Sequence, residues 1–170
     1  MTTCRLSFES ELAASPEEVW AWATSPDGIS SELRPLVRMT FPADQATLAE
    51  SGFMPGRPLF RSWFLLFGLL PVDRLHLTLL EFEPGRRFLE QSPMLSMRCW
   101  RHERIVVPCA GGVRLTDNLA FAPRLARPLV AWFVKLLFRQ RHRVLRRRFG
   151  QGLRESAAHG GSGRSGSPDR

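Results

Sequence analysis

Apolar and polar residues alternate along most of the chain, and a period of two is typical of β-strands with one buried face. Residues 4–12 place Leu6, Phe8, Ser10 and Leu12 on one side of the first predicted strand. Further strands are predicted at 32–41, 58–70, 71–83, 86–92, 97–107 and 112–121, with turns at 68–71 and 83–85. Residues 42–57 are rich in proline, glycine and alanine and predict a loop.

Helix signals interrupt this pattern twice. Ser15 followed by Pro16 and Glu18 forms a capping box, which predicts a short helix, and residues 25–28 break it before a second helical turn through Glu32. In residues 123–150 the period changes, with Leu125, Leu129, Trp132, Phe133, Leu136 and Val144 at the spacing of one helical face. We therefore expect a long helix that buries this face, and an α+β domain with an antiparallel sheet and its helices on one side.

The composition is that of one domain. A chain of 170 residues with 44% hydrophobic content can form one sizeable core, which we assign to residues 1–152, whereas the Gly/Ser/Arg-rich residues 153–170 predict a disordered tail. Three scattered cysteines indicate neither a disulfide framework nor a metal site, and no cofactor motif is found. The apolar runs are too short for a membrane span, and no basic stretch precedes an apolar run at the start, so we expect a cytoplasmic protein.

The net charge of +8 comes from one region. Residues 135–154 contain eight basic residues and no acid, while the rest of the chain is balanced at 16 basic and 16 acidic residues. Cations suit the end of a helix, so a solvated helix end is the simplest interpretation. No aromatic residues are interleaved as nucleic-acid binding would need, so we expect no nucleic-acid partner. Weak contact with anionic membranes through the arginines from Arg139 to Arg148 stays open.

Polar residues lie within the predicted hairpin at residues 100–121. If residues 109–112 form its turn, Trp100 faces Phe121, His102 faces Leu119 and Arg104 faces Asp117, all on the inward side. Buried charges need partners, which Arg104 and Asp117 can supply to each other, and Arg141 and His142 are further candidates. Three interpretations remain: a self-satisfied core cluster, anchors at the wall of a cavity, or general acid–base groups. No nucleophile motif is present, so no catalytic residue is assigned.

These landmarks follow one another as they do in a known superfamily. The opening strand followed by SPEEVWAWATSPDGIS, the pair WRHERIVV and GGVRLTDNLAF, and the segment FRQRHRVLRRRFG resemble the START-like or Bet v 1-like (SRPBCC) superfamily over about residues 3–150. That superfamily includes polyketide cyclase/dehydrase-like and lipid-transfer domains. The resemblance implies a helix-grip fold, in which a curved antiparallel sheet wraps around the C-terminal helix and leaves a hydrophobic cavity. By position, Trp100, His102 and Asp117, with Arg141 and His142, correspond to landmarks of a bacterial-type subgroup.

The leading hypothesis is a domain that binds or carries a hydrophobic small molecule such as a lipid, a sterol or an aromatic polyketide. Its expected apolar lining is Trp63, Trp100, Leu119, Phe121 and Phe133, and its expected polar anchors are His102, Arg104 and Asp117. Two alternatives stay open. One is a cyclase/dehydrase-like enzyme in which His102 and Asp117 shuttle protons, and the other is lipid exchange at an anionic membrane surface.

Overall fold

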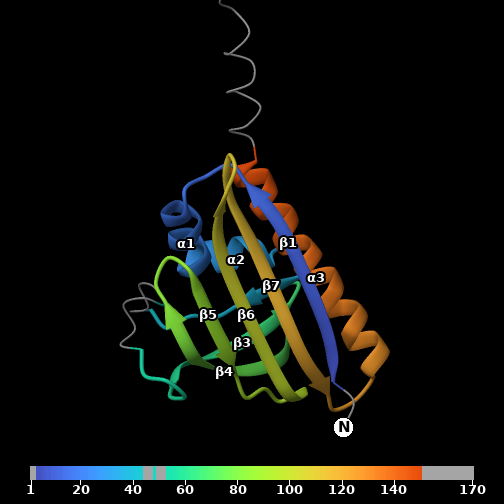
Figure 1. Ribbon diagram of the computed structural model, residues 1–170. Helices are drawn as coiled ribbons and strands as arrows, with labels where there is room; N and C mark the ends of the chain where they lie inside the picture. Colours follow the sequence, from blue (N-terminus) through green and yellow to red (C-terminus); the bar gives the residue numbers. More distant parts are fainter. Residues whose placement is uncertain (1–2, 44–47, 49–52, 151–170) are drawn as a thin grey trace, which may run out of the picture.

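The computed structural model describes residues 3–43, 48 and 53–150. Its elements follow in the order β1 (Cys4–Leu12), α1 (Pro16–Thr24), α2 (Pro26–Leu33), β2 (Val37–Met39), β3 (Pro58–Leu66), β4 (Leu70–Glu83), β5 (Arg87–Gln91), β6 (Met97–Cys109), β7 (Gly112–Pro123) and α3 (Arg127–Phe149). Figure 1 shows the long α3 beside the sheet, on the side where β1 lies. The predicted order of elements is confirmed. The expected tail at residues 153–170 lies outside the described residues.

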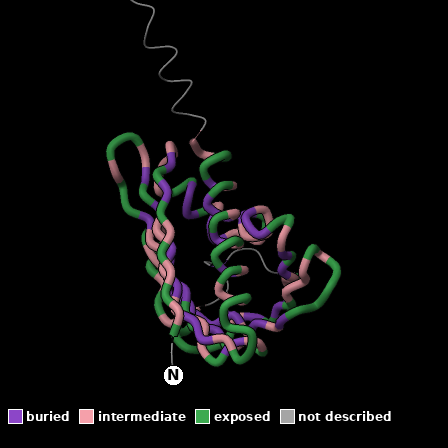
Figure 2. Tube along the Cα trace, turned by 90° about the vertical axis from the view of Figure 1, so that its right-hand side faces the viewer, coloured by how far each residue is buried: buried purple, intermediate pink, exposed green. Residues whose placement is uncertain are grey.

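One antiparallel sheet of seven strands has the order β1-β7-β6-β5-β4-β3-β2. Its pairing shifts at several irregularities, including one between Leu79 and Glu81 on β4 and one between Phe64 and Leu65 on β3. Bulges bend a strand and increase its twist, so these shifts help the sheet to curl. In Figure 2 the curled sheet partly surrounds α3. The predicted α+β helix-grip arrangement is therefore confirmed.

The first two helices begin where the sequence signals predict. Ser15 caps α1: its hydroxyl accepts from the backbone of Glu18, and the Glu18 carboxylate accepts from the Ser15 backbone. Ser25 then ends α1 and caps α2, because its side chain accepts from the backbone of Gly28. This tight junction leaves the end of α2, including Glu32, against the interior of the sheet.

The hairpin of β6 and β7 has the predicted register. Trp100 pairs with Phe121, His102 with Leu119 and Arg104 with Asp117, and Cys109 pairs with Gly112 around the two-residue turn. The inward face is buried as expected, and it carries the three polar residues into the core.

The predicted buried face of the long helix is wrong for four of its six residues, since only Phe133 and Val144 are half-buried. The residues of α3 that are buried are Val134, Phe138, Arg141, His142 and Leu145. In contrast, Leu129, Trp132 and Leu136, with Leu125 just before the helix, are exposed. The segment is apolar nearly all round, so hydrophobic spacing alone did not distinguish its two faces. Packing selected the face with Arg141 and His142, because both find buried acidic partners inside the fold.

Within the described residues, no helix is both long and apolar enough to cross a membrane.

Candidate functional site

Residues of the sheet and of all three helices line a small, partly open cavity of about 80 Å³. It is mainly apolar, because three of the sixteen described residues that line it are polar. These three are Glu90 from β5, His102 from β6 and Arg141 from α3. The apolar wall consists of Ala23, Ile29, Leu33, Met39, Leu48, Phe64, Leu75, Leu77, Leu79, Phe88, Trp100, Leu137 and Phe138. A few polar groups converging on an apolar cavity are characteristic of small-molecule sites.

The imidazole of His102 lies between two carboxylates. Its Nε2 is 2.9 Å from Asp117 Oδ1, and its Nδ1 is 3.5 Å from Glu90 Oε2. The rings of Phe88 and Phe138 meet the imidazole edge to face, at centroid distances of 5.3 and 5.2 Å. These contacts hold the ring in one orientation, with Nδ1 toward Glu90 at the cavity wall.

Glu90 is held by a chain of hydrogen bonds within the sheet. The hydroxyl of Ser92 donates to Glu90 Oε1 at 2.6 Å and accepts from the backbone N–H of Thr78 at 3.1 Å. Oε2 of Glu90 faces His102 at a distance too long for a strong hydrogen bond. This oxygen and His102 Nδ1 therefore keep capacity for a further hydrogen-bond partner.

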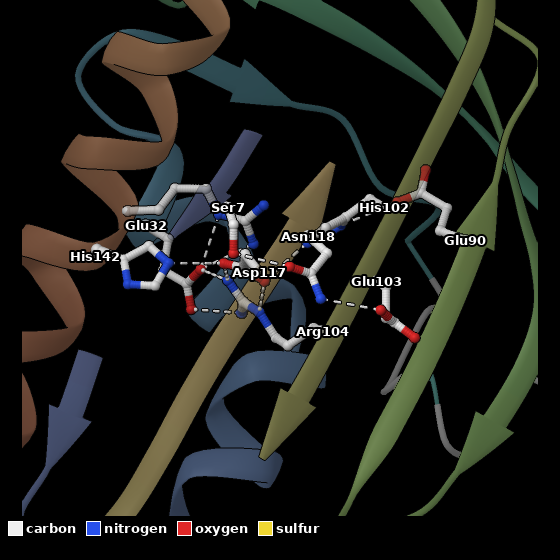
Figure 3. Close-up of polar contacts among 10 residues, drawn as sticks. Ser7, Glu32, Glu90, His102, Glu103, Arg104, Asp117, Asn118 and His142 are labelled. Atoms are coloured by element: carbon white, nitrogen blue, oxygen red, sulfur yellow. Dashed lines mark hydrogen bonds and ion pairs between the residues drawn. The ribbon is translucent and has the colours of Figure 1, made fainter. Parts of the chain in front are cut away.

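A buried network of charges lies behind His102 (Figure 3). Arg104 donates to Asp117 through Nε at 2.7 Å and Nη2 at 2.8 Å, and to both oxygens of Glu32 at 3.2 and 3.0 Å. Arg141 Nε also donates to Glu32 Oε2 at 2.9 Å. The side chains of Glu32, Arg104 and Asp117 are fully buried. Two cations thus balance two anions in a network that connects α2, the sheet and α3.

His142 extends this network to β1. Its Nε2 lies 3.1 Å from Asp117 Oδ2, and its Nδ1 lies 2.7 Å from Ser10 Oγ. An ionised carboxylate only accepts hydrogen bonds, so Nε2 of His142 carries a proton. Arg146 donates to Ser10 Oγ at 2.8 Å, which leaves the Ser10 hydroxyl free to donate to Nδ1 of His142. The inward position of Ser10, predicted from strand alternation, therefore has a polar partner on α3.

The network keeps Asp117 and Arg104 charged. Burial acts to raise the pKa of Asp117, but the charge and hydrogen bonds of Arg104, together with those of His102, hold this pKa well below its ordinary value. Burial also acts to lower the pKa of Arg104, and the charges of Asp117 and Glu32 raise it instead. Asp117 is consequently an anion whose acceptor sites are all directed at Arg104, His102 and His142, which suits a positioning role.

Two of the predicted site residues line the cavity, namely Trp100 and His102. Arg104 and Asp117 lie behind His102 and do not line the cavity. Leu119 and Phe121 pack in a cluster with Met97, Val134 and Phe138, and Phe133 packs at the edge of the cluster around Leu33 and Phe60. None of these three lines the cavity.

Trp63 is the predicted lining residue that the structure places farthest from its expected role. It is 45% exposed, and its ring lies against the guanidinium of Arg74. Its neighbour Phe64 lines the cavity instead. Because side chains alternate along β3, only one of two consecutive aromatic residues can face inward, and buried Phe60 and Ser62 put Phe64 on the inner face.

Two acidic residues of the site were missed by the sequence analysis. Glu90 had a usable signal, since it alternates with Phe88 on the inward face of β5. Glu32 had none, because its partners Arg104 and Arg141 are 72 and 109 residues away along the chain. In the part of the chain that the structure describes, no three His, Cys, Asp or Glu side chains are arranged to hold a metal ion.

Comparison with solved structures shows a START-like fold. A START superfamily protein from Mycobacterium smegmatis superposes with a TM-score of 0.58 at 11% identity, covering 88% of this chain and 97% of that one. An AHSA1 protein from Silicibacter pomeroyi has a TM-score of 0.55 at 18% identity, covering 84% and 94%. DynU16, from the dynemicin biosynthetic locus, has a TM-score of 0.51 at 14% identity, covering 84% of this chain and 46% of that one.

Sequence comparison identifies a family but no individual relative. The model described as "Domain of unknown function (DUF8410)" matches residues 10–149. No curated protein matches the sequence. The resemblance to the SRPBCC superfamily inferred from the sequence is confirmed at the level of fold.

Proposed function

The chain belongs to the family described as Domain of unknown function (DUF8410), and we propose that it binds a hydrophobic small molecule in the cavity between the sheet and α3. The observation that carries this proposal is an apolar cavity with the Glu90–His102 pair at its wall. The fold supports it, because the cavity lies between the sheet and the helices. The proposal includes a cytoplasmic location, which suits three free cysteines.

The polar pair specifies one feature of the ligand. Arg104 and Arg141 bond to Glu32 and Asp117, whereas the neighbours of Glu90 are Ser92 and His102. A ligand hydroxyl or amine donates to Glu90 Oε2, while the apolar wall holds its hydrocarbon part. We therefore expect a lipid, a sterol or a polyketide-like molecule with a hydrogen-bond donor at its buried end.

Trp100 controls how large this ligand is. Small-molecule sites commonly measure about 300–1,000 Å³, whereas this cavity measures about 80 Å³. Trp100 also lines an outer pocket of about 240 Å³, together with residues such as Met97 and Arg124. Because Trp100 lines both spaces, we propose that rotation of its indole joins them and lets a full-sized ligand enter.

The test is ligand retention measured by native mass spectrometry, combined with thermal-shift screening of fatty acids, sterols and aromatic polyketides. Wild-type protein is expected to retain or be stabilised by members of one class. Trp100→Ala is expected to accept larger members of that class, whereas the matched control Trp63→Ala changes an indole outside the cavity and leaves binding unchanged. Glu90→Gln is expected to weaken ligands with a donor group selectively. The proposal is wrong if neither wild type nor Trp100→Ala binds any class.

A second candidate function is acid–base catalysis on a polyketide-type substrate. It is favoured by the line from Asp117 through His102 to Glu90, in which a buried carboxylate orients an imidazole whose other nitrogen faces the cavity. In this arrangement His102 transfers the proton, and Asp117 positions it without touching substrate. Turnover of aromatic polyketide substrates that is unchanged in His102→Ala would exclude this function.

Lipid exchange at an anionic membrane is a further form of the binding proposal. It requires a surface that docks on lipid, and the arginines from Arg139 to Arg148 are only partly available for it. Arg141 bonds to Glu32, Arg146 donates to Ser10, and Arg148 lies 3.8 Å over the ring of Trp22.

A further inference from the structure

The outer side of α3 carries uncovered apolar residues along its first half. Leu129 is 63% and Trp132 60% exposed, and Leu136 also reaches the surface. Spacings of three and four residues put these side chains on one helical face, opposite the buried row of Val134, Phe138 and Leu145. Figure 2 shows α3 with exposed segments along its length on the side away from the sheet. An uncovered apolar row of this kind marks an interaction surface.

The turn between β3 and β4 adds a second set of exposed apolar residues, namely Phe67, Leu69, Leu70 and Val72. Residues 34–36 hydrogen-bond both to this turn and to α3. The backbone N–H of Phe67 donates to the Leu36 carbonyl at 2.9 Å, and the side chain of Gln140 on α3 donates to the Arg34 carbonyl at 3.1 Å. We call the outer row of α3 and this turn together the apolar face.

The charge on the α3 segment of the apolar face has one sign. Residues 124–150 contain nine cations and no acid. On α3, the exposed Arg139 and Arg143 continue the row of Trp132 and Leu136 at the same helical spacing. The outer side of the helix is therefore apolar in its first half and cationic in its second half. The turn at residues 67–72 contains no charged residue.

We propose that the apolar face docks on the surface of an anionic membrane. Trp132 and the leucines enter the boundary between headgroups and acyl chains, while Arg139 and Arg143 bind lipid phosphates. A second copy of the chain does not fit as well, because α3 has no acidic residue that could pair with Arg139 and Arg143 of the other copy in a symmetric dimer. This proposal does not depend on a ligand in the cavity, although Leu137 and Phe138, which line the cavity, directly follow Leu136.

The proposal is tested by flotation of the full chain with vesicles. One set contains phosphatidylcholine alone, and the other is an equimolar mixture with phosphatidylglycerol. We expect binding to the anionic vesicles to be at least about tenfold tighter, and to weaken as NaCl rises from about 0.1 M to about 0.5 M. The double variant Leu129→Ser/Trp132→Ser is expected to bind at least about tenfold less tightly. The charge variant Arg139→Glu/Arg143→Glu is expected to lose vesicle affinity by a similar factor.

Matched controls lie on the opposite side of the sheet. Val107→Ser removes an exposed apolar side chain and Arg101→Glu reverses an exposed charge, both on the outer side of β6. Both are expected to bind like wild type. Because all substituted residues are exposed, unchanged thermal unfolding confirms that each variant folds.

Three results would overturn the proposal. The first is failure of wild-type protein to bind anionic vesicles, and the second is equal binding to neutral and anionic vesicles. The third is a dimer in sedimentation velocity that Leu129→Ser/Trp132→Ser dissociates, which would assign the apolar face to a second copy. Ligand retention in wild-type protein is measured separately, so failure here leaves the proposed cavity function standing.

Discussion

Replacing Asp117 with asparagine tests the buried network most directly. The substitution keeps the size of the side chain but removes its charge and turns one acceptor oxygen into a donor group. Asp117 accepts hydrogen bonds from Arg104 on both oxygens and from one histidine on each, His102 and His142. Whichever way the asparagine amide is turned, its NH₂ group faces donors of the network.

The expected loss follows from the balance of charge. Arg104 and Arg141 are neutralised by Glu32 and Asp117 inside the fold, so Asp117→Asn leaves one buried cation without an anion. Removing one partner of a buried ion pair typically costs about 3–5 kcal/mol of unfolding free energy. In a domain of this size each kcal/mol lowers the thermal midpoint by about 2–4 °C, so we expect a decrease of roughly 6–20 °C.

Urea unfolding of wild type and Asp117→Asn, followed by circular dichroism, measures this loss. The matched control is Asp27→Asn, which removes an exposed aspartate in the first turn of α2 and is expected to change stability by less than about 0.5 kcal/mol. The unfolding free energy must fall with urea concentration at the same slope in both proteins for their stabilities to be compared. A loss below about 1 kcal/mol for Asp117→Asn would refute a network of fully buried, mutually dependent charges.

The same variant predicts a pH dependence. In the folded protein the pKa of Asp117 is held well below its ordinary value of 3.8. Its ionised form therefore contributes stability at pH values above about 4, and this contribution is lost as the pH falls further. The stability difference between wild type and Asp117→Asn should shrink on acidification below about pH 4. A difference that grows in this range would contradict the assigned charge state.

Two further comparisons test packing. Leu145→Ala, on the buried face of α3, is expected to lower the free energy of unfolding by about 2–5 kcal/mol. Leu129→Ala, on the exposed face, is expected to lower it by less than about 0.5 kcal/mol. Equal losses in urea unfolding would contradict the observed orientation of the helix. Gly112→Ala is expected to destabilise more than Gly68→Ala in thermal unfolding. Both glycines have positive φ, but a Cβ at Gly112 would lie 2.0 Å from the Leu12 carbonyl oxygen, whereas nothing lies within 4 Å at Gly68. Equal losses would show that the backbone at Gly112 moves freely.

The features that the sequence predicted correctly depend on residues close together in the chain. The capping box of Ser15 and Glu18 needs three residues, and the register of β6 and β7 follows from one turn and the alternation of side chains on either side of it. That register brought Arg104 opposite Asp117 and put His102 on the same face. The order of elements was predictable for the same reason, whereas the helix-grip fold was predicted from the resemblance to the START-like superfamily.

The predictions that failed involve segments where several neighbouring residues are apolar. Trp63 and Phe64 are both aromatic, so composition did not show which of them faces inward. Around Leu129 and Trp132 the helix is apolar nearly all round, and its orientation was decided by Arg141 and His142, which reach buried anions. Without the position of these anions, hydrophobic spacing has no means to choose between the faces.

The candidate site shows most clearly which features the sequence determines and which depend on the tertiary structure. The sequence by itself determined that His102 points inward and that Arg104 has a partner across the hairpin. Only the tertiary structure brought Glu32 to Arg104, Glu90 to His102 and the end of α3 to both, and only it separated the cavity wall from the sealed network behind. The physical reason is range: strand alternation and helix caps act within a few residues, whereas burial and charge pairing depend on which distant segments meet when the sheet curls around α3.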